Sequence, residues 1–144
     1  MSTLDPSRET YLLERNALAS LYKNVSDQTL ARVLPAALAL SVRRATARGD
    51  VDPTQLEITN RPAEGPDHHD PIPLPRITVA GLLAIDRFVE MLPSLRASRD
   101  AEQAARVRSD ADLVPLMRNA LERTSPELPY LMAHENLVEH MGVE

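Results

Sequence analysis

Apolar residues recur every three or four positions along most of the chain, which is the spacing of one face of an α-helix. The first such segment follows Asp5-Pro6, an N-cap residue and a proline at the first helical position, and continues to about Asn24. The second follows Ser26, another N-cap candidate, and ends at Gly49, which is placed as a C-terminal glycine stop. We therefore expect the chain to begin with a helical hairpin.

Two prolines interrupt this pattern, and each should bend or divide a helix, because proline lacks an N–H and clashes with the preceding turn. Pro35 should kink or split the second helix near Leu34. Pro93 should end a helix that is capped by Thr78 and start another that reaches about Arg108. On the helix that starts at Thr78, the spacing turns these residues inward: Val79, Leu82, Ile85, Phe88, Val89 and Leu92.

Ser109 is expected to cap a further helix, and Ser125-Pro126 to open a last one that ends near Met141. The segment 50–76 holds six of the twelve prolines, and we expect it to be an extended connection. The predicted fold class is all-α, an irregular bundle of about five or six helices. It forms one domain over 1–144, with a hairpin at 1–49, a long proline-rich loop at about 50–76 and a helical segment at 77–141.

Composition supports a helical fold and excludes several functional classes. The chain has one Phe, three Tyr and no Trp, and it is rich in the helix formers Ala and Leu. With no cysteine, disulfides and thiolate metal sites are excluded. The formal net charge of −5 disfavours a nucleic-acid surface, which requires a clustered basic excess. No apolar stretch is long enough to span a bilayer, and no secretory signal pattern is present, so we expect a cytoplasmic protein.

The first helix is apolar nearly all round and carries charges within its apolar arc. On a helical wheel, Tyr11, Leu18 and Tyr22 share a side on which Glu14 and Arg15 also fall. These two charges cannot pair with each other, because adjacent helical residues point about 100° apart. Each needs a partner from elsewhere if it is buried. We expect such a helix to need more neighbours than a small bundle supplies, and an absent companion domain would provide them.

The same helix carries a family resemblance. Its pattern Tyr11-x-x-x-Arg15-Asn16, followed by a Lys-Asn pair at Lys23, resembles the helix just after the catalytic domain in many family 2 glycosyltransferases. The resemblance implies an interdomain or substrate-proximal position for Glu14, Arg15, Asn16 and Lys23. Arg15 would reach a diphosphate or a catalytic-domain carboxylate, and Asn16 would hydrogen-bond sugar or backbone. The alternative is a packing helix whose polar groups are satisfied.

Two later segments resemble the tail of a high-GC bacterial subgroup of that family. One is Leu34-Pro35-Ala-Ala-Leu-Ala-Leu with Arg43-Arg44, and the other is the stretch 99–110. The likeness covers most of residues 8–123. The family's catalytic domain binds a divalent metal through an Asp-x-Asp-like motif, and residues 1–10 leave no room for such a domain. We therefore expect no catalytic residue, metal site or cofactor in this chain and no activity in isolation, since the divalent metal would belong to the absent catalytic domain.

Three clusters could be mistaken for metal sites. Asp110-x-Asp112 has the spacing of the family's metal motif, but it lies at a helix start, where capping explains both carboxylates. The His-His-Asp cluster at 68–70 lies in the proline-rich loop and lacks the second element that a closed site needs. His134 and His140 face different sides of a helix. We expect none of these clusters to hold a metal.

Arg99, Gln103 and Arg106 share one face of a predicted helix with Arg96, and they are candidates for binding a phosphate or an anionic membrane surface. The alternative is a solvated face balanced by nearby acidic residues.

These observations predict a C-terminal accessory domain of a family 2 glycosyltransferase, which makes a cell-envelope glycan from a nucleotide sugar. The partner would be the catalytic domain or another copy of the chain, in the cytoplasm or peripheral to the inner face of the membrane. Two alternatives stay open. One is a stand-alone helical adaptor or dimerisation module, and the other is a small transferase assembled with a separate catalytic chain.

Overall fold

The structure is a computed structural model that describes residues 5–51 and 73–113. Within these ranges every regular element is helical: α1 (Pro6–Asn24), α2 (Asp27–Arg48) and α3 (Arg76–Ala104), followed by a helical turn at 110–113. The all-α prediction is thus confirmed for this part of the chain. Most of the proline-rich loop and the helix expected from Ser125 lie outside the described residues, so the helix count stays a prediction.

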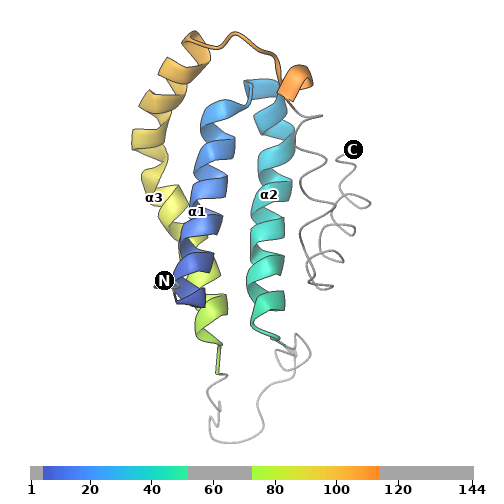
Figure 1. The fold of residues 1–144 in the computed structure, drawn as a ribbon, viewed down its shortest axis with the longest axis vertical. Coiled ribbons are helices and arrows are strands. Elements are labelled where there is room, and N and C mark those ends of the chain that lie inside the picture. The colour runs from blue at the N-terminus through green and yellow to red at the C-terminus, as the bar shows by residue number, and fades with distance from the viewer. Residues whose placement is uncertain (1–4, 52–72, 114–144) are drawn as a thin grey trace, which may run out of the picture.

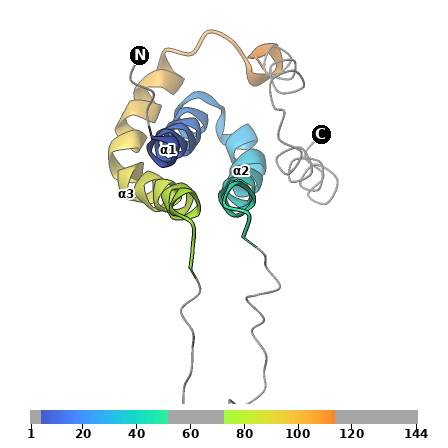
Figure 2. The ribbon, with the colours of Figure 1, turned by 60° about the horizontal axis from the view of Figure 1, so that its bottom comes forward.

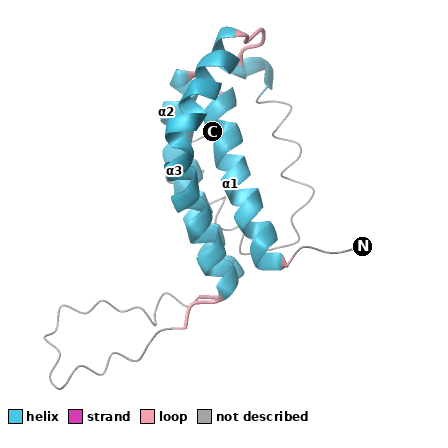
Figure 3. Ribbon diagram, turned by 90° about the vertical axis from the view of Figure 1, so that its left-hand side faces the viewer, coloured by secondary structure: helices cyan, strands magenta, loops and turns pink. Residues whose placement is uncertain are grey.

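α1, α2 and α3 pack together, and each helix contacts the other two in the described part of the chain (Figures 1 and 2). α2 runs antiparallel to α1, whereas α3 runs parallel to α1 and bends around it. The contact between α1 and α3 is the most extensive of the three pairs. Seen from the side in Figure 3, the three helices share one long direction.

The first two helices start where the sequence predicted. A carboxylate oxygen of Asp5 accepts a hydrogen bond from the backbone N–H of Arg8 at 3.3 Å, which caps α1. The hydroxyl of Ser26 accepts from the N–H of Thr29 at 3.3 Å, which caps α2.

Gly49 ends α2 as predicted, but the physical reason differs from the expected one. Its φ is −88°, in the right-handed region, and the residue with a left-handed backbone is Asp50, with a φ of 52°. Gly49 lacks a side chain where α3 comes close, and a Cβ at this position would collide with the hydroxyl of Thr78 on α3.

Both prolines lie inside continuous helices, so the division predicted at Pro93 is wrong and α2 is not split at Leu34. α3 begins after Pro75 with no side-chain cap, and Thr78, the expected cap, is a buried helical residue. Pro93 is exposed on α3, which curves around α1 (Figure 2). A bent helix with proline on its solvent side tolerates the lost hydrogen bond better than a straight packed one.

Small residues let α2 and α3 approach closely. Ser41 and Ala45 are fully buried on α2, and a Cβ built on Gly81 of α3 would lie only 2.6 Å from the Ala45 Cβ. The larger core side chains gather farther along the bundle, where Tyr22 meets Phe88 edge to face with ring centroids 6.2 Å apart. The buried cluster there consists of Leu18, Ala19, Phe88 and Leu95.

Candidate functional site

α3 presents apolar side chains on two opposite sides. Phe88 is buried as predicted, but Val79, Leu82 and Val89, which were expected to face inward with it, are 37, 36 and 53% exposed. That expectation is wrong because the inner side of α3 is formed by small residues that fit against α2, among them Thr78, Gly81 and Ala84. Leu83 is also exposed, at 53%. We call the exposed set the outer face of α3: Val79, Leu82, Leu83 and Val89.

Charged residues are interspersed with the outer face. Arg87 donates to the Glu90 carboxylate at 2.7 Å, and this hydrogen bond and charge raise the pKa of Arg87. Both side chains are about half exposed, so the pair contributes little to folding. Asp86 is exposed and makes no hydrogen bond or ion pair with the described residues. The outer face is therefore a set of exposed apolar side chains with charged residues between its members.

Two of the predicted interdomain residues, Arg15 and Asn16, lie on the accessible surface of α1. Tyr11 of α1 is within electrostatic reach of Arg87 on α3. The Arg15 guanidinium lies over the Tyr11 ring, 5.5 Å from its centroid, and donates to the side-chain amide oxygen of Asn16 at 2.9 and 3.1 Å. Asn16 is exposed and Arg15 is partly exposed, so both side chains are accessible from solvent.

Glu14, the third predicted interdomain residue, lies inside the fold. It is 4% exposed and accepts hydrogen bonds from Ser41 at 3.0 Å and from the Arg44 guanidinium at 2.8 and 2.5 Å. The expectation that its charge needs a partner beyond the small bundle is wrong, because α2 supplies one.

The predicted anion-binding residues contact the turn between α1 and α2. Arg99, which is 6% exposed, donates to the Tyr22 carbonyl and, at 2.6 Å, to the Asp27 carboxylate. Its guanidinium also lies 5.4 Å from the Tyr22 ring centroid. Gln103 donates to the backbone carbonyls of Lys23 and Val25 at 3.0 and 3.2 Å. Lys23, the fourth predicted interdomain residue, thus contacts α3 through its backbone.

Arg106 begins the crossing from α3 back toward α2. It donates to the Asp110 carboxylate, to the Arg108 carbonyl at 2.7 Å and to the Gln103 side chain at 3.3 Å. We call residues 105–110 the strap. The prediction that Arg99, Gln103 and Arg106 bind an anion stays a prediction. An anion would have to compete with the backbone carbonyls and carboxylates to which these side chains already donate.

The two acidic residues of the Asp-x-Asp triplet act separately. Asp112 accepts from the backbone N–H and hydroxyl of Ser109 at 3.0 and 2.7 Å, which is a helix cap. Asp110 reaches across to α2 and accepts from the N–H and hydroxyl of Ser26 at 3.0 and 2.5 Å. Burial alone would raise the pKa of Asp110, but hydrogen bonds from Ser26, Thr29 and Arg106 outweigh it and lower the pKa well below its ordinary value.

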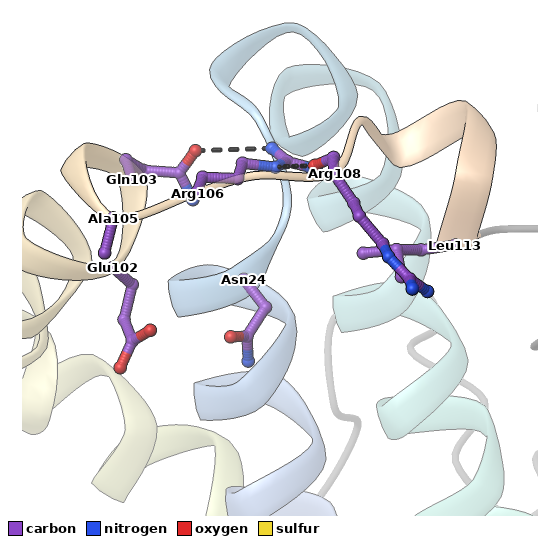
Figure 4. Close-up of a pocket in the computed structure, with 7 residues that line it drawn as sticks. All are labelled: Asn24, Glu102, Gln103, Ala105, Arg106, Arg108 and Leu113. Carbon is purple, nitrogen blue, oxygen red and sulfur yellow. Dashed lines mark hydrogen bonds between the residues drawn. The ribbon is translucent and has the colours of Figure 1, made fainter.

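No group of acidic or histidine side chains within the described ranges could hold a metal ion. A hollow of about 170 Å³ opens beside the strap, and in Figure 4 hydrogen bonds link Gln103, Arg106 and Arg108 along its rim. Sites for drug-sized ligands usually measure about 300–1,000 Å³, so this hollow is too small for a nucleotide sugar. Its lining residues are Asn24, Glu102, Gln103, Ala105, Arg106, Arg108 and Leu113.

Comparisons with protein-family models, curated proteins and solved structures returned no match. Among the helices of the described chain, none is long and apolar enough to cross a membrane. The fold and its surfaces are therefore the basis for a functional hypothesis, together with the sequence resemblance.

Proposed function

We propose that this chain is a helical accessory domain that packs on the nucleotide-sugar-binding catalytic domain of a family 2 glycosyltransferase and does not transfer sugar by itself. The observation that carries the proposal is the outer face of α3, where four large apolar side chains are 36 to 53% exposed on one helix. A helix that is apolar on opposite sides is usually covered on both. Several large apolar side chains exposed on one helix form a surface that another protein can cover.

The sequence resemblance supplies the kind of partner, and the position of Arg15 and Asn16 agrees with it. Both are accessible from solvent on α1, where the Arg15 guanidinium lies over the Tyr11 ring. A protein docked on the outer face of α3 would meet exposed apolar side chains with charged residues between them. In this proposal the complex works in the bacterial cytoplasm or at the inner membrane surface and makes a cell-envelope glycan. The complete domain would be the predicted bundle of five or six helices with its proline-rich connection.

The test is complex formation with a purified nucleotide-sugar-binding catalytic domain of the family 2 glycosyltransferases. Leu83→Asp places a charge on the outer face, and Leu13→Asp places one on α1 at nearly equal exposure, 53 against 55%. We expect Leu83→Asp to weaken the complex at least tenfold, whereas Leu13→Asp leaves it unchanged and both variants keep their helical circular dichroism. An unaffected Leu83→Asp complex, or no complex with the unchanged chain, would refute the proposal.

The second candidate is a dimerisation module, because the same outer face could cover a second copy. Light scattering of the isolated chain distinguishes the two. A dimer that dissociates when Leu83 is replaced by aspartate favours self-association through the outer face. A chain that stays monomeric at about 100 μM excludes dimerisation at ordinary cellular concentrations. Nucleotide-sugar hydrolysis by the isolated chain, above the background of a buffer blank, would show instead that the domain is catalytic alone.

A further inference from the structure

We infer that the strap is a latch on the α1–α2 turn, that it opens while the three helices stay packed, and that Asp110 holds it closed. The strap leaves α3 and crosses over the turn to the start of α2 (Figure 1). This inference is independent of the proposed docking on the outer face of α3.

The first observation is that, among the residues the structure describes, the strap reaches α2 through one carboxylate. Asp110 accepts two hydrogen bonds from Ser26 and one from Arg106, so a single side chain joins the strap to the N-terminus of α2. Hydrogen bonds to a charged group contribute more than neutral ones, so removal of this carboxylate should shift the opening equilibrium strongly.

The second observation is that no apolar side chain anchors the strap. Val107 is 96% exposed, and Ala105, Arg108 and Ser109 are exposed as well. Segments with little buried apolar surface open locally at a much lower free energy than the whole fold. The strap therefore has the properties of a separate opening unit.

The third observation is that α3 holds the turn without help from the strap. Arg99 and Gln103 are residues of α3 itself, and they donate to the carbonyls of Tyr22, Lys23 and Val25. An open strap would leave these contacts intact. Ser26 and Arg106 would lose the carboxylate that they share and become available to another acceptor.

Limited trypsin digestion tests the latch, because Arg106 and Arg108 are cleavage sites within the strap. Arg32 and Arg43 are exposed on α2 and serve as internal reference sites for the folded core. The two variants to compare are Asp110→Ala and Asp112→Ala. They remove the same charge from the same helical turn, but Asp112 bonds only to Ser109. Ser26→Ala, which removes one donor to Asp110, is a second variant from the other side of the contact.

We expect Asp110→Ala to speed cleavage at Arg106 and Arg108 about tenfold, the factor that corresponds to losing a hydrogen bond to a charged group. Ser26→Ala should give a smaller increase at the same two sites, and Asp112→Ala should cleave at nearly the unchanged rate. Cleavage at Arg32 and Arg43 should not change in the two aspartate variants, whereas Ser26→Ala also removes the N-cap of α2 and is judged by Arg43 alone. The inference is overturned if Asp110→Ala leaves the strap sites as slow as before. It is also overturned if the strap and reference sites accelerate together with a lower unfolding midpoint, since the strap would then open only with the core.

Discussion

Replacement of Arg44 by methionine would test whether the charge of Glu14 depends on α2. Methionine keeps much of the length of the arginine stem and fills similar space, but it cannot donate to a carboxylate. Glu14 would keep only the hydrogen bond from Ser41, at 3.0 Å. Its side chain would remain at 5% exposure in the packed bundle, where water could not replace the lost guanidinium.

The size of the effect follows from this burial. Removal of one partner from a buried ion pair typically costs about 3–5 kcal/mol, because the remaining charge stays desolvated. The Arg44 side chain is 15% exposed, so some water already reaches the pair, and we expect the lower end, about 3 kcal/mol. Combining Arg44→Met with Glu14→Gln removes the charge itself and should restore part of this loss.

The assay is urea unfolding followed by circular dichroism, with Arg87→Met as the control. Arg87 also pairs with a glutamate, but both partners are about half exposed, so its replacement should leave the unfolding midpoint nearly unchanged. Equal destabilisation by Arg44→Met and Arg87→Met would refute the reasoning. A double variant less stable than Arg44→Met alone would also contradict it.

Three further predictions concern the α2–α3 contact and the strap. Gly81→Ala should destabilise by about 1–3 kcal/mol, since its Cβ would lie 2.6 Å from that of Ala45, and Ala45→Gly in the same chain should restore stability in urea unfolding. Thr78→Val should stabilise the fold by about 1 kcal/mol, because it removes a buried hydroxyl that has no hydrogen-bond partner within residues 5–51 and 73–113, and an unchanged or lower unfolding midpoint would show that the hydroxyl is satisfied. The lowered pKa of Asp110 means that its bonds to Ser26 contribute stability above the ordinary aspartate pKa of 3.8, and that this contribution is lost as the pH falls further. Arg106 is the cation that faces Asp110, and the neighbouring Asp27 is paired with Arg99. Hydrogen exchange at the Ser26 amide, corrected for intrinsic rates, should therefore be equally protected at pH 5 and pH 7. Loss of this protection already at pH 5 would show that a group other than Asp110 controls it.

Local sequence signals predicted the helices of the hairpin well. Asp5 and Ser26 are caps whose side chains act on their own helices, so the sequence alone carries the relevant information. Proline was a less reliable guide. The solvent-facing position of Pro93, which lets α3 continue and curve, depends on where α1 lies and cannot be read from neighbouring residues.

The inner side of α3 was predicted correctly for Phe88, Ile85 and Leu92 but wrongly for the exposed residues of the outer face, because hydrophobicity was the only criterion. Gly81 faces α2 because Ala45 leaves no space for a larger side chain, whereas Leu82 and Leu83 are left outside. Similarly, the wheel position of Glu14 indicated that it was buried, but not that Arg44 would reach it from α2. Such pairings depend on how helices cross, which a helical wheel does not contain.

The parallel contact between α1 and α3 has a consequence for how the chain reaches its native state. α1 packs most extensively on the helix that is synthesised last among the three, so its largest partner is missing while the ribosome is still translating α2 and the connection. The nascent hairpin exposes Leu18 and Tyr22 until α3 emerges, because their packing partners on α3 lie far away in the sequence. A longer connection between α2 and α3 would add only about 0.6 kcal/mol of closure free energy for each doubling of its length, so the length of that segment has little effect on the stability of the α1–α3 contact.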